Sequence, residues 1–97
     1  MATFVLTYRA PEGYTVGSPQ ARGAWTDWFE AIGAHIADIG KPVVETSALG
    51  NIGAGTRLGG YSIITADDLE EAVGLAKGCP FIDLNGGVEV GVLGEVS

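Results

Sequence analysis

The order of helix-like and strand-like segments constrains the fold of this chain more than any other feature of its sequence. The first helix-like segment has apolar residues at helical spacing, which places them on one stripe: Trp25, Trp28, Phe29, Ile32, Ile36 and Ile39. Ser18 followed by Pro19 is typical of a helix start, because the hydroxyl caps the first turn and proline fits the first helical position. Gly40, with Pro42 just beyond it, predicts the end of this segment. We therefore expect a helix over residues 19–39.

The second helix-like segment begins with the capping-box pattern Asp-Asp-Leu-Glu, in which Asp67 is the expected cap and Glu70 follows three residues later. Its apolar residues line one face of a short helix: Leu69, Ala72, Val73 and Ala76. Gly78 ends the pattern, and Pro80 prevents the helix from resuming. We expect a helix over residues 68–77.

Four further segments are predicted to be extended. Residues 2–9 and 61–65 are rich in β-branched and aromatic residues, residues 42–46 are short, and residues 88–96 alternate between two faces. The glycine-containing segment 10–17 is predicted to be a loop, and the glycine-rich segment 47–60 to be a loop or an irregular hairpin. The resulting order β-α-β-β-α-β predicts an α+β, ferredoxin-like fold with an antiparallel sheet and helices on one face. With 97 residues, we expect one domain over 1–97.

The second face of such a sheet meets either water or a partner. It would carry Val5 or Ile64, depending on the register of the strands. A chain of 97 residues with an apolar open face predicts a homodimer.

The charge of the chain argues against several classes of partner. Five Lys and Arg stand against twelve Asp and Glu, so the net charge is −7, whereas nucleic acid and anionic membranes require basic patches. No apolar run approaches the ~18 residues of a membrane span, and we expect a cytoplasmic protein of bacterial type without a signal peptide. The single cysteine, Cys79, excludes an internal disulfide and is expected to be inert.

No cofactor or metal is expected from the sequence. The glycine-rich stretch at residues 50–55 matches neither a dinucleotide fingerprint nor a P-loop, so it is predicted to be a loop, with a lid over a cleft as the alternative. One histidine and no spaced acidic motif leave too few metal ligands.

A series of short motifs in the second half of the chain has a specific order and spacing. The motifs are GGYSII at 59–64, ADDLEEA at 66–72, AKGCPF at 76–81 and GGVEV at 86–90. Over residues 59–93 the chain resembles the YCII-related (DGPF-type) family, and residues 25–42 fit it more loosely. The resemblance implies a dimeric α+β barrel, in which two ferredoxin-like sheets face each other across a two-fold axis. The role of most members is undefined, so the resemblance implies a fold rather than a reaction.

Some members of that family carry a His and an Asp that are proposed as an acid–base pair, and some relatives with this barrel act on small aromatic compounds. The zone of the family's His is Trp25-Thr26-Asp27 here, so the histidine does not align. The zone of its Asp is 43–46, where Glu45 supplies a carboxylate. The DGPF-type segment is replaced by residues 51–58.

Two residues are candidate catalytic groups that move a proton. His35 flanks the apolar stripe, and a histidine is a common general base at neutral pH. Glu45 lies near the end of an expected strand, where a carboxylate beside aromatic rings can exchange protons. The plainer interpretation is a boundary histidine that covers Trp28 and a solvated glutamate.

Four residues are candidate ligand contacts. Tyr8, Trp28 and Tyr61, together with Trp25, are candidate walls of a cavity, since aromatic side chains supply much of the apolar area of small-molecule pockets. Arg9 ends the first expected strand and can hold a ligand carboxylate in a bidentate fork. The alternative is that the aromatic residues fill a small core and that Arg9 neutralises a nearby carboxylate.

Two classes of function remain open from the sequence. One is an enzyme or binder of a small, aromatic molecule in a cleft between the sheet and the first helix. The other is a non-catalytic dimerising module that contacts a protein partner. A ligand-sized apolar cavity with Glu45 or His35 at its rim would favour the first, and a solid core would favour the second.

Overall fold

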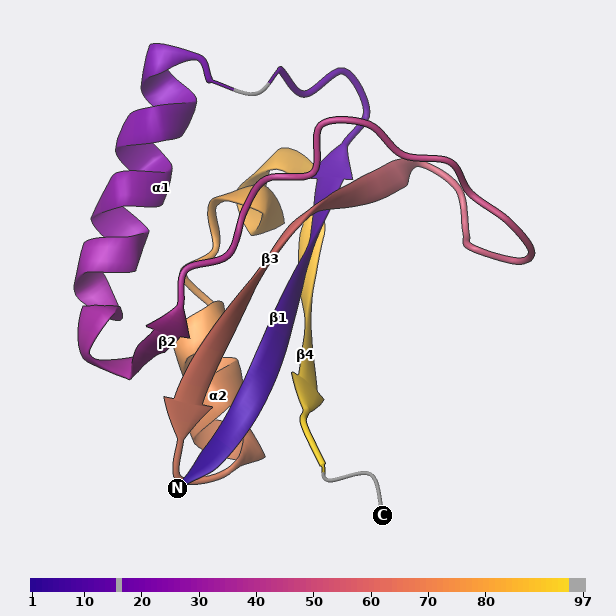
Figure 1. The fold of residues 1–97 in the computed structure, drawn as a ribbon. Helices are drawn as coiled ribbons and strands as arrows, with labels where there is room; N and C mark the ends of the chain where they lie inside the picture. The colour runs from indigo at the N-terminus through magenta and orange to yellow at the C-terminus, as the bar shows by residue number, and fades with distance from the viewer. Residues whose placement is uncertain (16, 95–97) are drawn as a thin grey trace.

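The computed structural model describes residues 1–15 and 17–94 (Figure 1). Its four strands are hydrogen-bonded in the order β2-β3-β1-β4, and all three neighbouring pairs are antiparallel. The strands are β1 (Ala2–Pro11), β2 (Ile36–Asp38), β3 (Thr56–Ala66) and β4 (Gly87–Val92). Helix α1 (Pro19–Ala31) follows β1, and helix α2 (Leu69–Ala76) follows β3. This order confirms the predicted α+β, ferredoxin-like fold class.

Helix α1 begins where the sequence predicts but ends eight residues earlier than residue 39. The Ser18 hydroxyl accepts a hydrogen bond of 3.2 Å from the Ala21 backbone N–H, as expected of a cap. The chain then forms a short 3-10 helix, η1 (Gly33–His35), and continues into β2. Ile36 therefore pairs with Ile64 on β3 instead of extending the helical stripe. The predicted helix was too long because residues at this spacing also satisfy an edge strand.

The strand predicted at residues 42–46 is wrong, because β2 lies earlier in the chain. Beyond β2 the chain makes only an isolated bridge to β3, between Pro42 and Gly60. Residues 44–55 are all exposed, and β3 begins at Thr56 within the segment that was predicted to be a loop. In Figure 1 this exposed segment extends away from the helices beyond the start of β3.

Helix α2 has the predicted capping box, displaced by one residue. Asp68 is the cap, and its carboxylate accepts a hydrogen bond of 2.8 Å from the Glu71 N–H. The Glu71 carboxylate in turn accepts one of 2.9 Å from the Asp67 N–H. The two hydrogen bonds are reciprocal, as in a capping box.

The segment between α2 and β4 forms a second 3-10 helix, η2 (Pro80–Leu84), which the sequence analysis did not predict. It ends at Asn85, whose backbone is left-handed with φ of 65°. Strand β4 ends at Val92, earlier than the predicted residue 96, which lies outside the described residues.

The register of β1 separates a core face from an outer face. Both helices contribute to the core, which contains twelve buried apolar side chains: Phe4, Leu6, Tyr8, Ala10, Trp28, Ile32, Ile64, Ala66, Ala72, Ala76, Cys79 and Phe81. Val5 pairs with Ile63 and Thr7 with Tyr61, so these residues lie on the opposite face, which we call the outer sheet face. Of the two residues considered for the outer face, Val5 occupies it and Ile64 is fully buried in the core.

Among the described residues, no helix has the length and apolar character that crossing a membrane requires.

Candidate functional site

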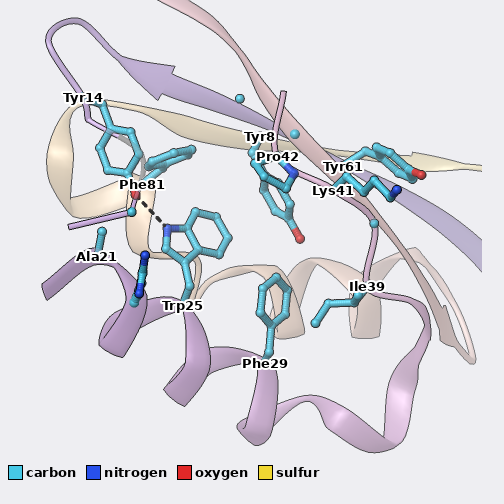
Figure 2. A pocket seen from close by; sticks show the side chains of 15 residues that line it. Tyr8, Tyr14, Ala21, Trp25, Phe29, Ile39, Lys41, Pro42, Tyr61 and Phe81 are labelled. Atoms are coloured by element: carbon cyan, nitrogen blue, oxygen red, sulfur yellow. Dashed lines mark hydrogen bonds between the residues drawn. The ribbon is translucent and has the colours of Figure 1, made fainter. Parts of the chain in front are cut away.

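A pocket of about 430 Å³ lies between helix α1, strands β1 and β3, and the turn after β2 (Figure 2). The residues around it come from β1, the loop before α1, α1 itself, the turn after β2, β3 and η2: Tyr8, Tyr14, Gly17, Ala21, Arg22, Trp25, Phe29, Ile39, Gly40, Lys41, Pro42, Gly59, Gly60, Tyr61 and Phe81. Its volume lies within the range of small-molecule sites, about 300–1,000 Å³. We expected from the sequence a cleft between the sheet and the first helix, and the pocket lies there.

Aromatic rings form one wall of the pocket, and they are fixed by contacts with one another. Trp25 packs edge-on against both Tyr8 and Phe81, with ring centroids 4.9 Å apart in each case. The Trp25 indole N–H also donates a hydrogen bond of 3.2 Å to the Tyr14 hydroxyl, drawn in Figure 2. Phe29, one helical turn further along α1, lies with its ring centroid 5.6 Å from that of Trp25. These contacts preorganise an apolar wall that a flat ring can stack against.

The second tryptophan lies behind this wall. Trp28 is not among the residues that line the pocket, and only 6% of its surface is exposed. Its indole N–H donates to the Leu75 backbone carbonyl at 3.1 Å, which ties α1 to α2. A Cβ at Gly78 would lie 2.7 Å from the Trp28 ring, so the chain after α2 packs closely against it. Trp28 is therefore a core residue. Of the two tryptophans that we expected to line a cavity, Trp25 does so.

Two buried hydroxyl groups lie next to each other at this site: that of Tyr8, which lines the pocket, and that of Ser62 behind it, which does not. Tyr8 donates a hydrogen bond of 2.7 Å to Ser62 Oγ, and Ser62 donates one of 2.6 Å to the Ile39 backbone carbonyl. Burial raises the pKa of the Tyr8 phenol above its ordinary value, so this group keeps its proton. Ser62 was missed by the sequence analysis, although it lies two residues before buried Ile64 and hence on the same face of β3.

The turn that closes the pocket depends on glycine. Gly40 has φ of +75°, and a Cβ there would lie 1.7 Å from the Tyr61 carbonyl oxygen. The Gly40 N–H donates to the Asp38 carboxylate at 2.9 Å, which holds the turn at the end of β2. Only glycine allows the backbone to pass this close to β3 and carry Ile39 to the hydroxyl of Ser62.

The charged residues that line the pocket are both basic, within the part of the chain that the structure describes. Arg22 and Lys41 are exposed, and a Cβ on Gly17 would lie 3.7 Å from Arg22 Nη2. The Lys41 side chain extends toward Tyr61 in Figure 2. In a chain of net charge −7, two of the five basic residues are thus found at this pocket. An acidic substituent of a ligand fits beside either of these two side chains.

The structure places the two predicted catalytic residues outside the pocket. His35 lies in η1, where its Nδ1 is 2.9 Å from the Thr65 carbonyl oxygen, which can only accept a hydrogen bond. Glu45 is exposed in the segment that follows the Pro42 bridge. Neither residue is among those that line the pocket. The sequence could not reveal this, because both positions depend on the early end of α1.

Two of the predicted ligand contacts also lie away from the aromatic wall. Arg9 faces the outer sheet face, where its guanidinium donates to the Thr56 hydroxyl at 3.2 Å and to the Thr56 carbonyl at 3.0 Å. Tyr61 borders the pocket, but its ring points away from Phe29 (Figure 2). Of the predicted ligand contacts, Tyr8 is the one whose side chain belongs to the aromatic wall.

The described residues offer no evident set of metal ligands. Across residues 1–15 and 17–94, no three His, Cys, Asp or Glu side chains come together in a group that could hold a metal ion. Cys79 is buried, and burial raises the pKa of its thiol, so the thiolate needed for coordination or nucleophilic attack is disfavoured.

The fold and the pocket define a small α+β protein of ferredoxin-like topology with an aromatic site between one helix and the sheet. No protein-family model and no curated protein matches this sequence. Among solved structures, the chain is similar to 5-chloro-2-hydroxyhydroquinone dehydrochlorinase from Burkholderia phenoliruptrix AC1100, solved in complex with 2,5-dihydroxybenzoquinone. The TM-score is 0.57 and the identity 21%, over 96% of this chain and 95% of the other. At this identity the likeness shows the fold alone, and it agrees with the ferredoxin-like α+β arrangement described above.

Proposed function

We propose that this protein binds a small aromatic molecule in the pocket between α1 and the sheet. The observation that carries the proposal is the cavity of about 430 Å³, which has aromatic rings on one side and includes Tyr8, with its buried hydroxyl, among its lining residues. An apolar pocket with few, well-placed polar groups is the usual form of a small-molecule site. The similar dehydrochlorinase, which was solved with a small ring compound, adds support at the level of the fold.

Binding is better supported than conversion. His35 and Glu45, the groups first considered for proton transfer, do not line the pocket. Tyr8 does line it, but its raised pKa disfavours the tyrosinate that a general base would require. The proposal is therefore a ligand-binding protein, with membership of the YCII-related family as the accompanying hypothesis.

We further propose that two copies associate through the outer sheet face. Val5, Thr7 and Ile63 on this face are only partly buried in the single chain, and Tyr61 is 39% exposed. Face-to-face contact of two sheets would bury them, and burial of apolar area is the main driving force of such association. The resemblance to a family of dimeric barrels supports the same arrangement.

The proposed site is tested by titrating the isotope-labelled protein with phenol and following its indole and amide signals by NMR. We expect shifts at Trp25, Phe29 and Tyr14, and we expect a Trp25→Ala variant that remains folded to lose them. A Leu49→Ala variant is the matched control, because Leu49 is 83% exposed on the segment before β3. Shifts confined to residues 50–58, or none at all, would rule out the site.

A further inference from the structure

The buried hydroxyls of Tyr8, which lines the pocket, and of Ser62 behind it form a series of two hydrogen bonds, and the last acceptor of the series fixes its direction. The Ile39 backbone carbonyl can only accept a hydrogen bond, and it lies 2.6 Å from Ser62 Oγ. The single proton of Ser62 must therefore point toward Ile39. Ser62 Oγ is then an acceptor for its other neighbour, and Tyr8 donates its own proton to it at 2.7 Å.

The reverse direction is physically unfavourable. If Ser62 donated to Tyr8, its lone pairs would face those of the Ile39 oxygen at 2.6 Å, in a site where Ser62 has no exposed surface. Removing the proton from Tyr8 is also unfavourable, because burial raises the pKa of its phenol. The hydroxyl protons of Tyr8 and Ser62 are thus both used in hydrogen bonds within the protein.

This commitment determines what Tyr8 offers to a ligand. A phenol oxygen that has donated its proton retains only its capacity to accept. Among the described residues, the structure gives Tyr8 Oη a hydrogen bond only as a donor, to Ser62. Tyr8 lines the pocket, and Figure 2 shows its hydroxyl directed toward the side where Phe29 and Ile39 lie.

We infer that the pocket selects aromatic compounds that present a hydroxyl or N–H group to the Tyr8 oxygen, and that it rejects compounds presenting an acceptor there. This inference rests on the proposed function and assigns its ligand class. A carboxylate, ether or carbonyl oxygen placed against Tyr8 would leave two acceptors facing each other without a proton between them, which is costly where water is excluded. An anionic substituent fits instead near Arg22, which is exposed at the pocket.

The test compares phenol with anisole, its methyl ether, which keeps the ring and the oxygen but has no proton to donate. Dissociation constants are measured for both by NMR titration. We expect phenol to bind about two- to tenfold more tightly, the effect of one neutral hydrogen bond. In Tyr8→Phe the acceptor is lost, and the two compounds should bind with similar dissociation constants.

Ser62→Ala is the more specific test, because Ser62 influences the ligand only by accepting the hydrogen bond from Tyr8. Without Ser62 Oγ, Tyr8 can turn its proton to the anisole oxygen, so the preference for phenol should fall. A merely structural role for Ser62 would weaken both compounds equally and leave the ratio unchanged.

The outcomes separate the two proposals. Equal binding of phenol and anisole to the unaltered protein, with shifts at Trp25, would overturn the selection for donors and leave the aromatic site intact. The same conclusion follows if Ser62→Ala keeps the full preference for phenol. Failure of both compounds to bind would remove the aromatic site and the inference together.

Discussion

Gly40 is the residue on which the geometry of the pocket depends most directly. Its φ of +75° disfavours any other residue, and a Cβ would lie 1.7 Å from the Tyr61 carbonyl oxygen. We expect Gly40→Ala to lower the free energy of unfolding by at least about 2 kcal/mol. Gly23→Ala on α1 is the control, since its Cβ would meet nothing within 4 Å and alanine stabilises a helix by about 0.5–1 kcal/mol. Urea denaturation measures both, and equal stabilities would contradict this role of Gly40.

Tyr8 and Cys79 predict how stability depends on pH. Burial raises the pKa of both groups, from ordinary values of 10.0 and 9.0, so the folded chain holds protons that the unfolded chain has released. The contribution of these two groups to the free energy of unfolding should therefore be fully present at neutral pH and be lost as pH rises past about 9. Denaturation at several alkaline pH values measures this, and Cys79→Ala should remove the earlier part of the fall. A flat profile up to pH 10.5, or an unchanged one in Cys79→Ala, would contradict the account.

At the scale of single elements, the cap of α2 offers a test that separates neighbouring residues. The Asp68 side chain accepts from the Glu71 N–H, whereas Asp67 contributes its backbone N–H to the box. We expect Asp68→Ala to cost about 1 kcal/mol in stability, measured by denaturation, and Asp67→Ala to cost much less. The opposite ranking would place the cap at Asp67, where the sequence pattern alone put it.

The elements also show what sequence can and cannot predict in this fold. Ser18 and Pro19 predicted the start of α1, because capping is local. Its end was not predictable, since Ile36 fits a helical stripe as well as the pairing with Ile64 that it makes. Ser62 could have been assigned to the core face from its spacing to Ile64, but the Ile39 carbonyl that orients it is brought there by the tertiary fold.

For the whole molecule, the outer sheet face predicts the state of association. We expect the protein to sediment at about twice its chain mass of 9.9 kDa at micromolar concentration. Ile63→Asp should shift it toward the monomer, because a charge would be buried between two sheets. Val73→Asp on α2 is the control, because Val73 is 39% exposed on the helix side of the sheet, and it should leave the mass unchanged. A compact monomer of the unaltered protein would contradict the proposed dimer.

We propose above all that a small aromatic molecule occupies the pocket between α1 and the sheet. Intermolecular NOEs from the ring protons of bound phenol test it most directly, because they report contacts within about 5 Å of the ligand. We expect NOEs to Trp25 and Phe29, which line the pocket side by side on α1. NOEs only to residues 44–55 or to the outer sheet face, or none at saturating phenol, would contradict it.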